Sequence, residues 1–435
     1  MSSLFFYIRF MTIAQIHQLF LTHSTVCTDT RKITKDCIFF ALKGDNFNGN
    51  TYASEALEKG AAYAVVDEKE YAINNKFILV DDVLQALQQL GKYHRKKCKA
   101  KVIGLTGSNG KTTTKELIKA VIQKKYKTVA TVGNLNNHIG VPLTLLTIQK
   151  DTEIAIVEMG ANHLKEIAFL SSLAEPDYGY ITNFGKAHLE GFGSTEGVIQ
   201  GKSELYKYLT TNQKHVFLNA DDPIQESKLG TYVKKIGFSS NNSNYFKIEL
   251  LSADPFVTIK VKDITITTKL VGAYNFTNCC AAIIMGKYFN IALPLIKEAI
   301  EGYTPANNRS QILEQNGYKI ILDAYNANPT SMAAALDNFN GIKAAHKIVF
   351  LGDMFELGTT AETEHQHIAD KACKMNFTTT FLVGENFAKA KTEATQLATF
   401  KDLEEYLKKH PLQPNSNILI KGSRGMALER ILDIL

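Results

Sequence analysis

A strand, a glycine-containing turn and a helix follow one another over residues 102–122, and this order constrains the chain more than any other feature. The apolar run 102–105 predicts a buried strand, and residues 115–122 have apolar side chains at helical spacing. Between them stands Thr106-Gly107-Ser108-Asn109-Gly110-Lys111-Thr112-Thr113-Thr114. Glycines allow backbone N–H groups to converge on phosphate oxygens, and the helix N-terminus adds positive potential. The sequence therefore predicts a nucleotide-binding loop, in which Lys111 reaches the β- and γ-phosphates and Thr112 ligates Mg²⁺.

One position departs from the usual form of such a loop. The common pattern G-x-x-x-x-G-K-[ST] has a glycine six residues before the lysine, and Leu105 stands there. An ordinary surface turn could carry the same Gly-Lys-Thr letters. The strand predicted before the turn and the helix predicted after it favour the nucleotide-binding interpretation.

The composition is that of an ordinary soluble globular protein, and it excludes several classes. Apolar residues make up 45% and charged residues 21% of the 435 residues, and this length suggests two to four domains. A net charge of +6 suits small anionic substrates, and without a dense basic run we expect no nucleic-acid partner. The six cysteines have neither CxxC pairing nor metal-ligand spacing, which is typical of reduced thiols and predicts a cytoplasmic location.

The chain opens with an apolar stretch, Ser3-Leu4-Phe5-Phe6-Tyr7-Ile8-Arg9-Phe10. This stretch lacks a basic leading segment and a small-residue cleavage site, and it is too short to span a bilayer. We therefore expect no stable membrane association. A start codon placed too far upstream, with Met11 as the functional first residue, would explain the stretch equally well.

Alternating strand and helix patterns predict an α/β fold with three domains. Residues 1–100 form a small N-terminal α/β domain, residues 101–308 a central domain with a parallel sheet and the phosphate loop, and residues 309–435 a C-terminal, Rossmann-like α/β domain. Residues 245–271 alternate polar and apolar side chains, which predicts an antiparallel ribbon.

Short apolar runs bounded by turn residues mark the expected strands. They lie at 37–42, 62–66 and 78–80, then at 102–105, 128–131, 154–158, 178–182 and 216–219, and finally at 319–323, 347–352, 379–383 and 417–420. Helical periodicity is clearest at 13–20, 52–59, 82–96 and 275–288.

Polar residues follow several of these strands, where open α/β sheets bind their ligands. Glu158 ends an apolar strand, the position from which an NTPase holds Mg²⁺; a carboxylate in solvent is the alternative. His188 lies in a glycine-containing loop after the next strand, where an imidazole could ligate a metal or simply pack. Lys202 follows on an amphipathic helix, and taken alone it reads as a surface lysine.

Amide-rich loops follow other strands. Asn136 and Asn137 belong to the polar run 134–142, which ends in a Gly-Val-Pro turn. Asparagine offers a donor and an acceptor and suits a bound sugar or peptide, although a plain solvated loop is an equal alternative. In the third domain the loops 323–329, 351–358 and 421–424 each follow a strand, which suggests a second ligand-facing edge.

Six segments in this order resemble the Mur ligases, the ATP-dependent amide-forming enzymes of peptidoglycan precursor synthesis. They are 106–113, 136–142, 158–163, 187–193, 307–309 and 323–329. The resemblance covers the chain from about residue 11 to its C-terminus. Segments 158–163 and 323–329 point to the member that adds D-alanyl-D-alanine to UDP-MurNAc-tripeptide, so these two substrates are the expected partners, with a monomer as the expected state.

The resemblance implies an ATP site and a metal site. The implied ATP-binding residues are Gly107, Ser108, Asn109, Gly110, Lys111, Thr112, Thr113, Asn278, Arg309 and Asp323. Among them, Asn278 matches the adenine contact, Arg309 the γ-phosphate contact and Asp323 the ribose contact. The implied ligands of two Mg²⁺ ions are Thr112, Glu158, His188 and a carbamylated Lys202, and catalysis would rest on Lys111, Glu158, His188 and Lys202. Carbamylation would turn a cation that repels Mg²⁺ into an anionic oxygen ligand.

The resemblance also implies where the substrates bind. In the N-terminal domain Thr30, Arg31, Lys43 and Gly44 match segments that hold the UDP moiety, and the further substrate-binding candidates are Asn136, Asn137 and Asn326. Three positions depart from the family pattern: Tyr274 and Asn50 stand where histidine is usual, and Lys165 stands where glycine is usual.

The implied reaction passes through an acyl phosphate, which the amine of the dipeptide then attacks. Because Arg309 and Asp323 must meet a nucleotide held by residues 106–113, the third domain is expected to close over the site. A related ligase, of the folylpolyglutamate synthase type or one that adds meso-diaminopimelate, is the nearest alternative, and segment 325–329 argues against both. A nucleotide-dependent switch would need a guanine-reading Asn-Lys-x-Asp motif, which the sequence lacks.

Overall fold

The computed structural model describes residues 9–306 and 308–435, so Asn307 and most of the apolar opening stretch lie outside the described residues. The chain forms two compact units, each built from several segments. Unit 1 contains residues 1–104, 126–160 and 168–178, and unit 2 contains residues 105–125, 161–167 and 179–435. The predicted domain boundaries near residues 100 and 308 stay predictions.

A parallel five-stranded sheet in the order β1-β7-β6-β3-β2 lies in unit 1. Its strands are β1 (Arg9–Phe10), β2 (Val26–Cys27), β3 (Ile38–Phe40), β6 (Tyr63–Val66) and β7 (Phe77–Leu79). Between β3 and β6 a short hairpin, β4 (Lys43–Gly44) and β5 (Phe47–Asn48), precedes α2 (Ala53–Glu58). The strands expected at 37–42, 62–66 and 78–80 are confirmed to within a few residues.

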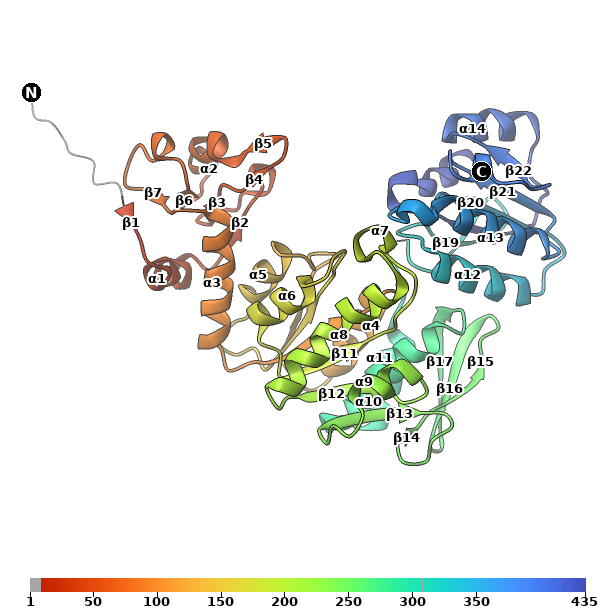
Figure 1. Ribbon diagram of the computed structural model, residues 1–435, viewed down its shortest axis with the longest axis horizontal. Helices are drawn as coiled ribbons and strands as arrows, with labels where there is room; N and C mark the ends of the chain where they lie inside the picture. Colours follow the sequence, from red (N-terminus) through yellow and green to blue (C-terminus); the bar gives the residue numbers. More distant parts are fainter. Residues whose placement is uncertain (1–8, 307) are drawn as a thin grey trace, which may run out of the picture. The chain divides into compact units, whose positions relative to one another are not determined.

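Helices cover both faces of this sheet because its strand residues point alternately to either side. Ile38 and Phe40 pack with α1 (Ile13–His23) and α3 (Val83–Lys97), whereas Phe39 packs on the opposite face with α2. Thr12 begins α1 with a capping box, and Asp82 accepts a hydrogen bond from the backbone of Gln85 at the start of α3. Figure 1 shows α1 beside α3.

A seven-stranded sheet follows in the order β14-β13-β12-β11-β8-β10-β9. Its strands are β8 (Lys101–Thr106), β9 (Thr128–Ala130), β10 (Ile154–Glu158), β11 (Tyr178–Ile181), β12 (His215–Asn219), β13 (Lys235–Ser239) and β14 (Phe246–Lys247). The pairings β9–β10, β12–β13 and β13–β14 are parallel, as the alternation of strands and helices predicted.

The predicted antiparallel ribbon at 245–271 is confirmed for most of its length. β15 (Glu249–Ser252), β16 (Phe256–Val261) and β17 (Ile264–Val271) form an antiparallel three-stranded sheet. The start of the range is a correction, because β14 pairs in parallel with β13. A two-residue strand at a sheet edge is too short to show a period, so alternation could not reveal its pairing.

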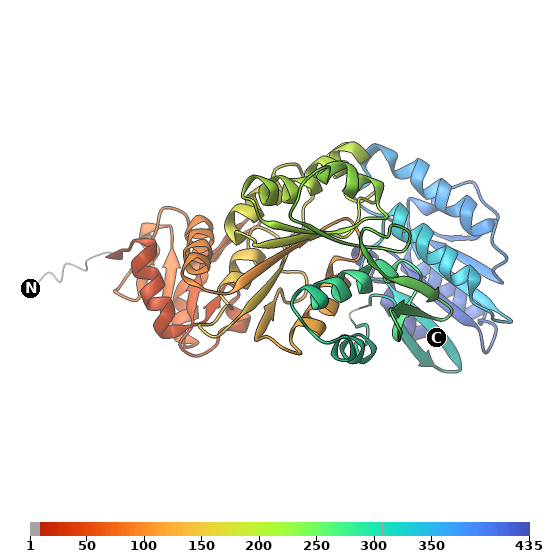
Figure 2. The same cartoon turned by 90° about the horizontal axis from the view of Figure 1, so that it is seen from below.

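The C-terminal part of unit 2 holds a six-stranded mixed sheet in the order β18-β19-β23-β20-β21-β22. Its strands are β18 (Gln311–Gln315), β19 (Tyr318–Asp323), β20 (Lys347–Gly352), β21 (Thr379–Val383), β22 (Thr395–Leu397) and β23 (Asn417–Lys421). All pairings are parallel except β18–β19. Figure 1 shows α12 (Pro329–Gly341) and α13 (Ala361–Cys373) on one side of this sheet and α14 (Phe400–Lys409) on the other, and Figure 2 turns the same arrangement by 90°.

One predicted turn is wrong. The Gly-Val-Pro sequence at 140–142 opens a helix, α5 (Gly140–Leu145), instead of ending a loop in a turn. Proline is tolerated there because the first N–H groups of a helix have no partner within it. Among the described residues, no helix is both long and apolar enough to cross a membrane.

Candidate active site

The predicted nucleotide-binding loop joins the end of β8 to α4 (Lys111–Ile122), so the strand–turn–helix prediction is confirmed. Both glycines of the loop have a positive φ, +144° at Gly107 and +76° at Gly110. A Cβ atom on Gly107 would overlap Thr182 Oγ1, and one on Gly110 would lie 2.6 Å from Asn278 Oδ1. Both positions therefore need glycine for conformation and for space.

The segment after β11 fixes the backbone of this loop. Thr182 Oγ1 and Asn183 Nδ2 donate to the carbonyl oxygen of Asn109 at 2.6 and 3.0 Å, and Asn183 Oδ1 accepts from the backbone N–H of Asn109 at 3.0 Å. Ser108 Oγ donates to Gly185 O at 2.7 Å. Side-chain bonds on both sides of one peptide unit hold the loop in a single shape.

Lys111 begins α4 and folds over the loop. Its Nζ donates to the carbonyl oxygens of Gly107 and Ser108 at 2.8 and 3.3 Å. Thr112, the next residue, is buried, with an exposed fraction of 9%. A cation and the N-terminus of a twelve-residue helix meet at a rigid loop, which is an arrangement that favours a bound anion.

Asn278 supports this helix from α10 (Asn275–Tyr288). It is nearly buried, and its Oδ1 accepts from Thr114 Oγ1 at 2.9 Å. Its Nδ2 donates to Asn275 Oδ1 at 2.8 Å. Both ends of the amide are thus engaged with protein groups, and the adenine contact stays a prediction.

Lys202 lies in the interior, so the interpretation as a surface lysine is wrong. It is on α8 (Thr195–Thr211) with an exposed fraction of 0%, and its Nζ donates to Ala161 O at 2.8 Å. The Nζ atom also lies 4.9 Å from the ring centroid of Phe192. Burial, and next the charge of Lys111, lower the pKa of Lys202 well below its ordinary value. A lowered pKa favours the neutral, nucleophilic form of the amine.

His188 precedes the short helix α7 (Leu189–Phe192) in a left-handed conformation, with φ of +54°. Its Nδ1 lies 2.5 Å from a carboxylate oxygen of Glu356, which is at ion-pair distance although the geometry is not that of an aligned hydrogen bond. His188, and to a smaller extent the charge of Lys111, hold the pKa of Glu356 below its usual value. Glu190 N donates to Glu356 O at 3.1 Å, so the loop after β20 is tied to this segment twice.

Glu158 ends β10 as predicted and is almost fully buried, with an exposed fraction of 1%. Asn136 Nδ2 donates to Glu158 Oε1 at 2.8 Å, and Thr131 Oγ1 accepts from the backbone N–H of Glu158 at 3.0 Å. Asn137 Oδ1 accepts from the backbone N–H groups of Ile139 and Gly140 at 3.1 and 2.9 Å. Asn136 therefore orients the carboxylate, and Asn137 stabilises the start of α5.

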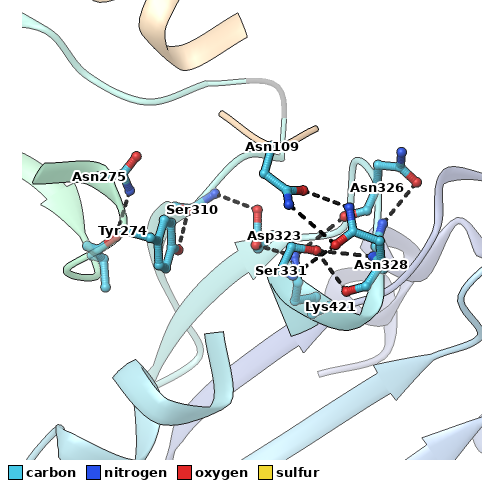
Figure 3. Close-up of polar contacts among 11 residues, drawn as sticks. Asn109, Tyr274, Asn275, Ser310, Asp323, Asn326, Asn328, Ser331 and Lys421 are labelled. Carbon is cyan, nitrogen blue, oxygen red and sulfur yellow. Dashed lines mark hydrogen bonds and ion pairs between the residues drawn. The ribbon is translucent and has the colours of Figure 1, made fainter. Parts of the chain in front are cut away.

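In the C-terminal part, Asp323 ends β19 between two partners (Figure 3). One carboxylate oxygen accepts from Ser310 N at 3.1 Å, and the other lies 2.5 Å from Lys421 Nζ, which is itself buried. Tyr274, one of the departures from the family pattern, makes a 2.8 Å hydrogen bond with Ser310 Oγ. These two contacts fix the orientation of the Asp323 carboxylate at the carboxyl edge of the sheet.

Arg309 stacks on an aromatic ring. Its guanidinium carbon lies 3.5 Å from the ring centroid of Tyr325, and that of Arg424 lies 6.0 Å from the same centroid. Asn326 follows Tyr325 and accepts through Oδ1 from the N–H of Ala327 at 2.9 Å. The loop after β19 thus collects two cations next to Asp323.

The candidate UDP-side residues lie in unit 1. Arg31 forms two hydrogen bonds with the Asp29 carboxylate, at 2.9 and 2.8 Å, and this contact lowers the pKa of Asp29 to about 2. Lys43, beside Gly44 in β4, lies 2.9 Å from Asp67 and 3.0 Å from Glu68. Thr30 opens the 3₁₀ turn that contains Arg31. These cations are exposed or half-exposed, and each is already oriented by a carboxylate.

Family models match three successive parts of the chain. The Mur ligase family catalytic domain matches residues 23–95, the Mur ligase middle domain residues 105–286, and the Mur ligase glutamate ligase domain residues 308–424. A UDP-N-acetylmuramoyl-tripeptide–D-alanyl-D-alanine ligase from Bacillus subtilis (strain 168) is 36% identical, over 94% of this chain and 92% of the relative.

The chain belongs to the Mur ligase family.

Solved structures agree with the fold of this Mur ligase. A crystal structure of MurF from Acinetobacter baumannii superposes with a TM-score of 0.83 at 28% identity, over 94% of this chain and 92% of that one. The MurF ligase from Thermotoga maritima, solved in complex with ADP, gives a TM-score of 0.83 at 24% identity over 95% and 97% of the two chains, a likeness in fold. The predicted three-domain α/β ligase fold is therefore confirmed.

The predicted site residues of this Mur ligase fall into two groups. Unit 2 contains the phosphate loop from Gly107 to Thr113 together with His188, Lys202, Asn278, Arg309, Asp323 and Asn326. Unit 1 contains Thr30, Arg31, Lys43, Gly44, Asn136, Asn137 and Glu158. Within unit 2 the structure brings the phosphate loop against Asn278 and, through Asn109, against the loop 323–329.

Sequence reasoning missed three residues that organise this region. Lys421 pairs with Asp323, Glu356 pairs with His188, and Asn328 bonds Asn109. Each lies in a loop or strand end that the sequence analysis had marked as polar. Their partners are 98, 168 and 219 residues away in sequence, so no local pattern could pair them.

Proposed function

We propose that this Mur ligase joins D-alanyl-D-alanine to UDP-MurNAc-tripeptide in an ATP-dependent reaction of peptidoglycan precursor synthesis. The likeness that carries the proposal is the 36% identity to a ligase of that name over nearly all of both chains. The rigid phosphate loop with Lys111 supports the use of ATP, because it offers a cation and a helix N-terminus to a polyphosphate.

The chemistry requires activation of a carboxylate, since oxide is too poor a leaving group for direct attack by an amine. Transfer of the γ-phosphoryl group to the tripeptide carboxylate gives an acyl phosphate and ADP. The dipeptide amine attacks the acyl carbon, the C–N bond forms, and inorganic phosphate leaves. Most of the protein's contribution is positioning and neutralisation of charge. Lys111 at the phosphates and Arg309 at the γ-phosphate are the residues that we assign to this task.

The predicted metal ligands have the donor atoms that Mg²⁺ prefers, but the side chains alone do not complete the coordination of two ions. Among the described residues, no group of three or more histidine, cysteine, aspartate or glutamate side chains converges as a metal site. Thr112, Glu158 and His188 supply oxygen and nitrogen donors, and a carbamate on Lys202 would add an anionic oxygen. Mg²⁺ so held would neutralise the phosphates and the substrate carboxylate.

The environment of Lys202 supports its carbamylation. Only a neutral amine attacks CO₂, and burial together with the charge of Lys111 lowers the pKa of Lys202, which favours the neutral form. In that step the Nζ lone pair forms an N–C bond, one C=O electron pair moves to oxygen, and a proton leaves the nitrogen. The resulting carbamate on Lys202 carries a negative charge close to the positive charge of Lys111.

On the substrate side we assign Thr30, Arg31, Lys43 and Gly44 to the UDP moiety, and Asn136, Asn137 and Asn326 to the rest of the substrates. The ribose would meet Asp323 and the adenine Asn278. A cytoplasmic location and a monomeric state belong to the same proposal, since the reaction consumes ATP and one chain carries both predicted groups of site residues.

Phosphate release by the purified protein tests the proposal. We expect release only when ATP, UDP-MurNAc-tripeptide and D-alanyl-D-alanine are all present, with a product heavier by one dipeptide in mass spectrometry. Glutamate, lysine and meso-diaminopimelate serve as alternative amines. Amide formation with one of these on a shorter UDP-linked acceptor, and none with the dipeptide, would assign the protein to another branch of the family.

A further inference from the structure

Two asparagines, 219 residues apart in sequence, join the phosphate loop to the C-terminal sheet. Asn328 Nδ2 donates to Asn109 Oδ1 at 2.7 Å, and Asn109 Nδ2 lies 3.4 Å from Asn328 Oδ1 as a second donor. Figure 3 shows the two amide groups facing each other. A pair of amides that each donate and accept gives a contact with one preferred orientation.

Each asparagine is fixed by its own surroundings. The backbone of Asn109 is held on both sides by Thr182 and Asn183. Asn328 is the N-cap of α12, where its Oδ1 accepts from Ser331 N at 2.9 Å and its own N–H donates to Ser331 Oγ at 3.1 Å. Asn328 is buried, with an exposed fraction of 7%. The pair therefore connects two rigid elements, the phosphate loop and the start of α12.

The contacts around the two asparagines are close. A Cβ atom on Gly185 would lie 2.8 Å from Asn109 Nδ2 and 3.2 Å from Thr330 Oγ1. Lys186 N donates to Thr330 Oγ1 at 3.0 Å, and Lys186 Nζ donates to Glu364 on α13 at 2.6 Å. Glycine at 185 allows the two backbones to meet closely enough for the amides to bond.

We propose that Asn328 is a positioning residue that couples occupancy of the phosphate loop to binding of the amine substrate. This inference rests on the proposed function. Asn109 of the phosphate loop holds Asn328 at the start of α12 and, through it, the preceding loop 323–329, which contains Asp323 and Asn326. A nucleotide bound at residues 106–113 and a substrate bound at loop 323–329 would each stabilise this same contact. Because coupling between sites is reciprocal, the amine must tighten nucleotide binding by the same factor.

The expected size of the effect follows from the 2.7 Å bond alone, because the second contact, at 3.4 Å, is long for a hydrogen bond. A neutral hydrogen bond contributes a factor of roughly 2 to 12 in an equilibrium constant. We therefore expect D-alanyl-D-alanine, with the UDP-linked acceptor present, to tighten the binding of a non-hydrolysable ATP analogue by about that factor. A shift of this size is within reach of calorimetry.

The deciding variant is Asn328→Ser. Serine is a good N-cap, so the hydroxyl can still accept from Ser331 N, but it is too short to reach Asn109. The matched control is Ser331→Ala, which weakens the same cap and leaves the Asn109 contact in place. We expect Asn328→Ser to abolish the mutual tightening and to raise the KM for the dipeptide more than it lowers kcat, and Ser331→Ala to keep both near the wild-type values.

A double-mutant cycle with Asn109→Ser completes the test, and we expect the double variant to show no more loss of coupling than Asn328→Ser alone. Full coupling in Asn328→Ser, or an equal loss in Ser331→Ala, would overturn the inference. Wild-type activity with the dipeptide is measured in parallel. If wild type is active but uncoupled, this inference fails while the proposed function stands, and an inactive wild type refutes the function itself.

Discussion

His188 Nδ1 and the carboxylate of Glu356 approach to 2.5 Å, and the partner of a candidate metal ligand thus comes from the loop that follows β20 of the C-terminal sheet. Histidines that bind metals usually have their second ring nitrogen on a carboxylate or carbonyl, which fixes the orientation of the ring. Glu356 occupies that position toward His188. The loop 351–358, marked in the sequence only as a polar strand-end loop, thereby acquires a specific role.

The variant Glu356→Gln should weaken metal binding. Loss of such an outer carboxylate typically costs about 10- to 100-fold in metal affinity or activity. Mn²⁺ binding in the presence of ADP, followed by electron paramagnetic resonance, measures the affinity without turnover. Glu362→Gln, on the exposed first turn of α13, removes the same charge and should change little. Equal Mn²⁺ affinity in wild type and Glu356→Gln would contradict the role.

The variant Lys202→Ala should lose activity by roughly 10²–10³, the usual effect of removing one electrostatic contact to a transition state. Short carboxylates such as acetate or propionate should restore part of it, since they can place an anionic oxygen in the space of the carbamate. Lys207→Ala on the same helix is exposed and serves as the control. Mass spectrometry of the wild-type protein under CO₂ should show that Lys202 has gained the mass of one CO₂ molecule, about 44 Da. An unmodified protein with full activity would exclude the carbamate.

The variant Lys111→Ala should abolish ATP-dependent ligation and leave the fold intact. Lys111 is half-buried at the start of α4, and its Nζ donates to the loop carbonyls of Gly107 and Ser108, so we expect its removal to leave the hydrophobic core intact. Isothermal calorimetry with ADP should show a loss of affinity, and circular dichroism should be unchanged. Lys119→Ala, later in α4, is the matched control. Near-normal turnover of Lys111→Ala would refute the role of the loop.

Acid should destabilise unit 1 through two buried histidines. His17 Nε2 and His94 Nδ1 lie 3.0 Å apart, and His94 Nε2 bonds Ile148 O at 2.8 Å. Burial lowers the pKa of both residues, and the charge of His94 lowers that of His17 further. The folded state therefore favours the neutral forms, so their contribution is present above the ordinary histidine pKa of about 6.5 and is lost as the pH falls through the lowered values.

Urea unfolding at pH 8, 6 and 5 measures this contribution. Burial also lowers the pKa of His215 and His365, so the comparison with a variant isolates the pair. His17→Gln keeps a donor toward His94 but cannot titrate. We expect the free energy of unfolding of His17→Gln to fall less steeply between pH 8 and pH 5 than that of wild type. Parallel slopes would show that the pair contributes nothing to the acid sensitivity.

Much of the fold follows from local sequence patterns, and the strand-to-loop positions of the site follow with it. Apolar runs bounded by turns located β8 and β10, and helical periodicity located α10. The position of Glu158 at the end of β10 came from the apolar run before it. Local patterns failed to predict whether a side chain is buried where that depends on packing between distant segments. Lys202 is on a helix with ordinary amphipathic spacing, and only the residues packed around that helix make its amine buried.

Three of the missed strands share one physical reason, whereas β13 and β18, with five residues each, were missed although their length is ordinary. β2, β14 and β22 have two or three residues each, too few for a period, and they are strands only because a neighbour pairs with them. The contacts Asp323–Lys421 and Asn109–Asn328 are also long-range, and a single sequence does not contain them. Only the three-dimensional structure reveals these two contacts.

Unit 1 is built from three separate segments of the chain, and this affects how it can fold during synthesis on the ribosome. Arg95 on α3 donates to Ala174 O at 3.0 Å and pairs with Asp177 at 2.9 Å, and Gly91 lies against Pro142 with no room for a side chain. The first 104 residues therefore leave the ribosome without the partners that cover α3. Unit 1 can reach its final form only after residue 178 has been synthesised, so the nascent chain passes through a stage in which α3 has an uncovered flank, a natural point for chaperone binding.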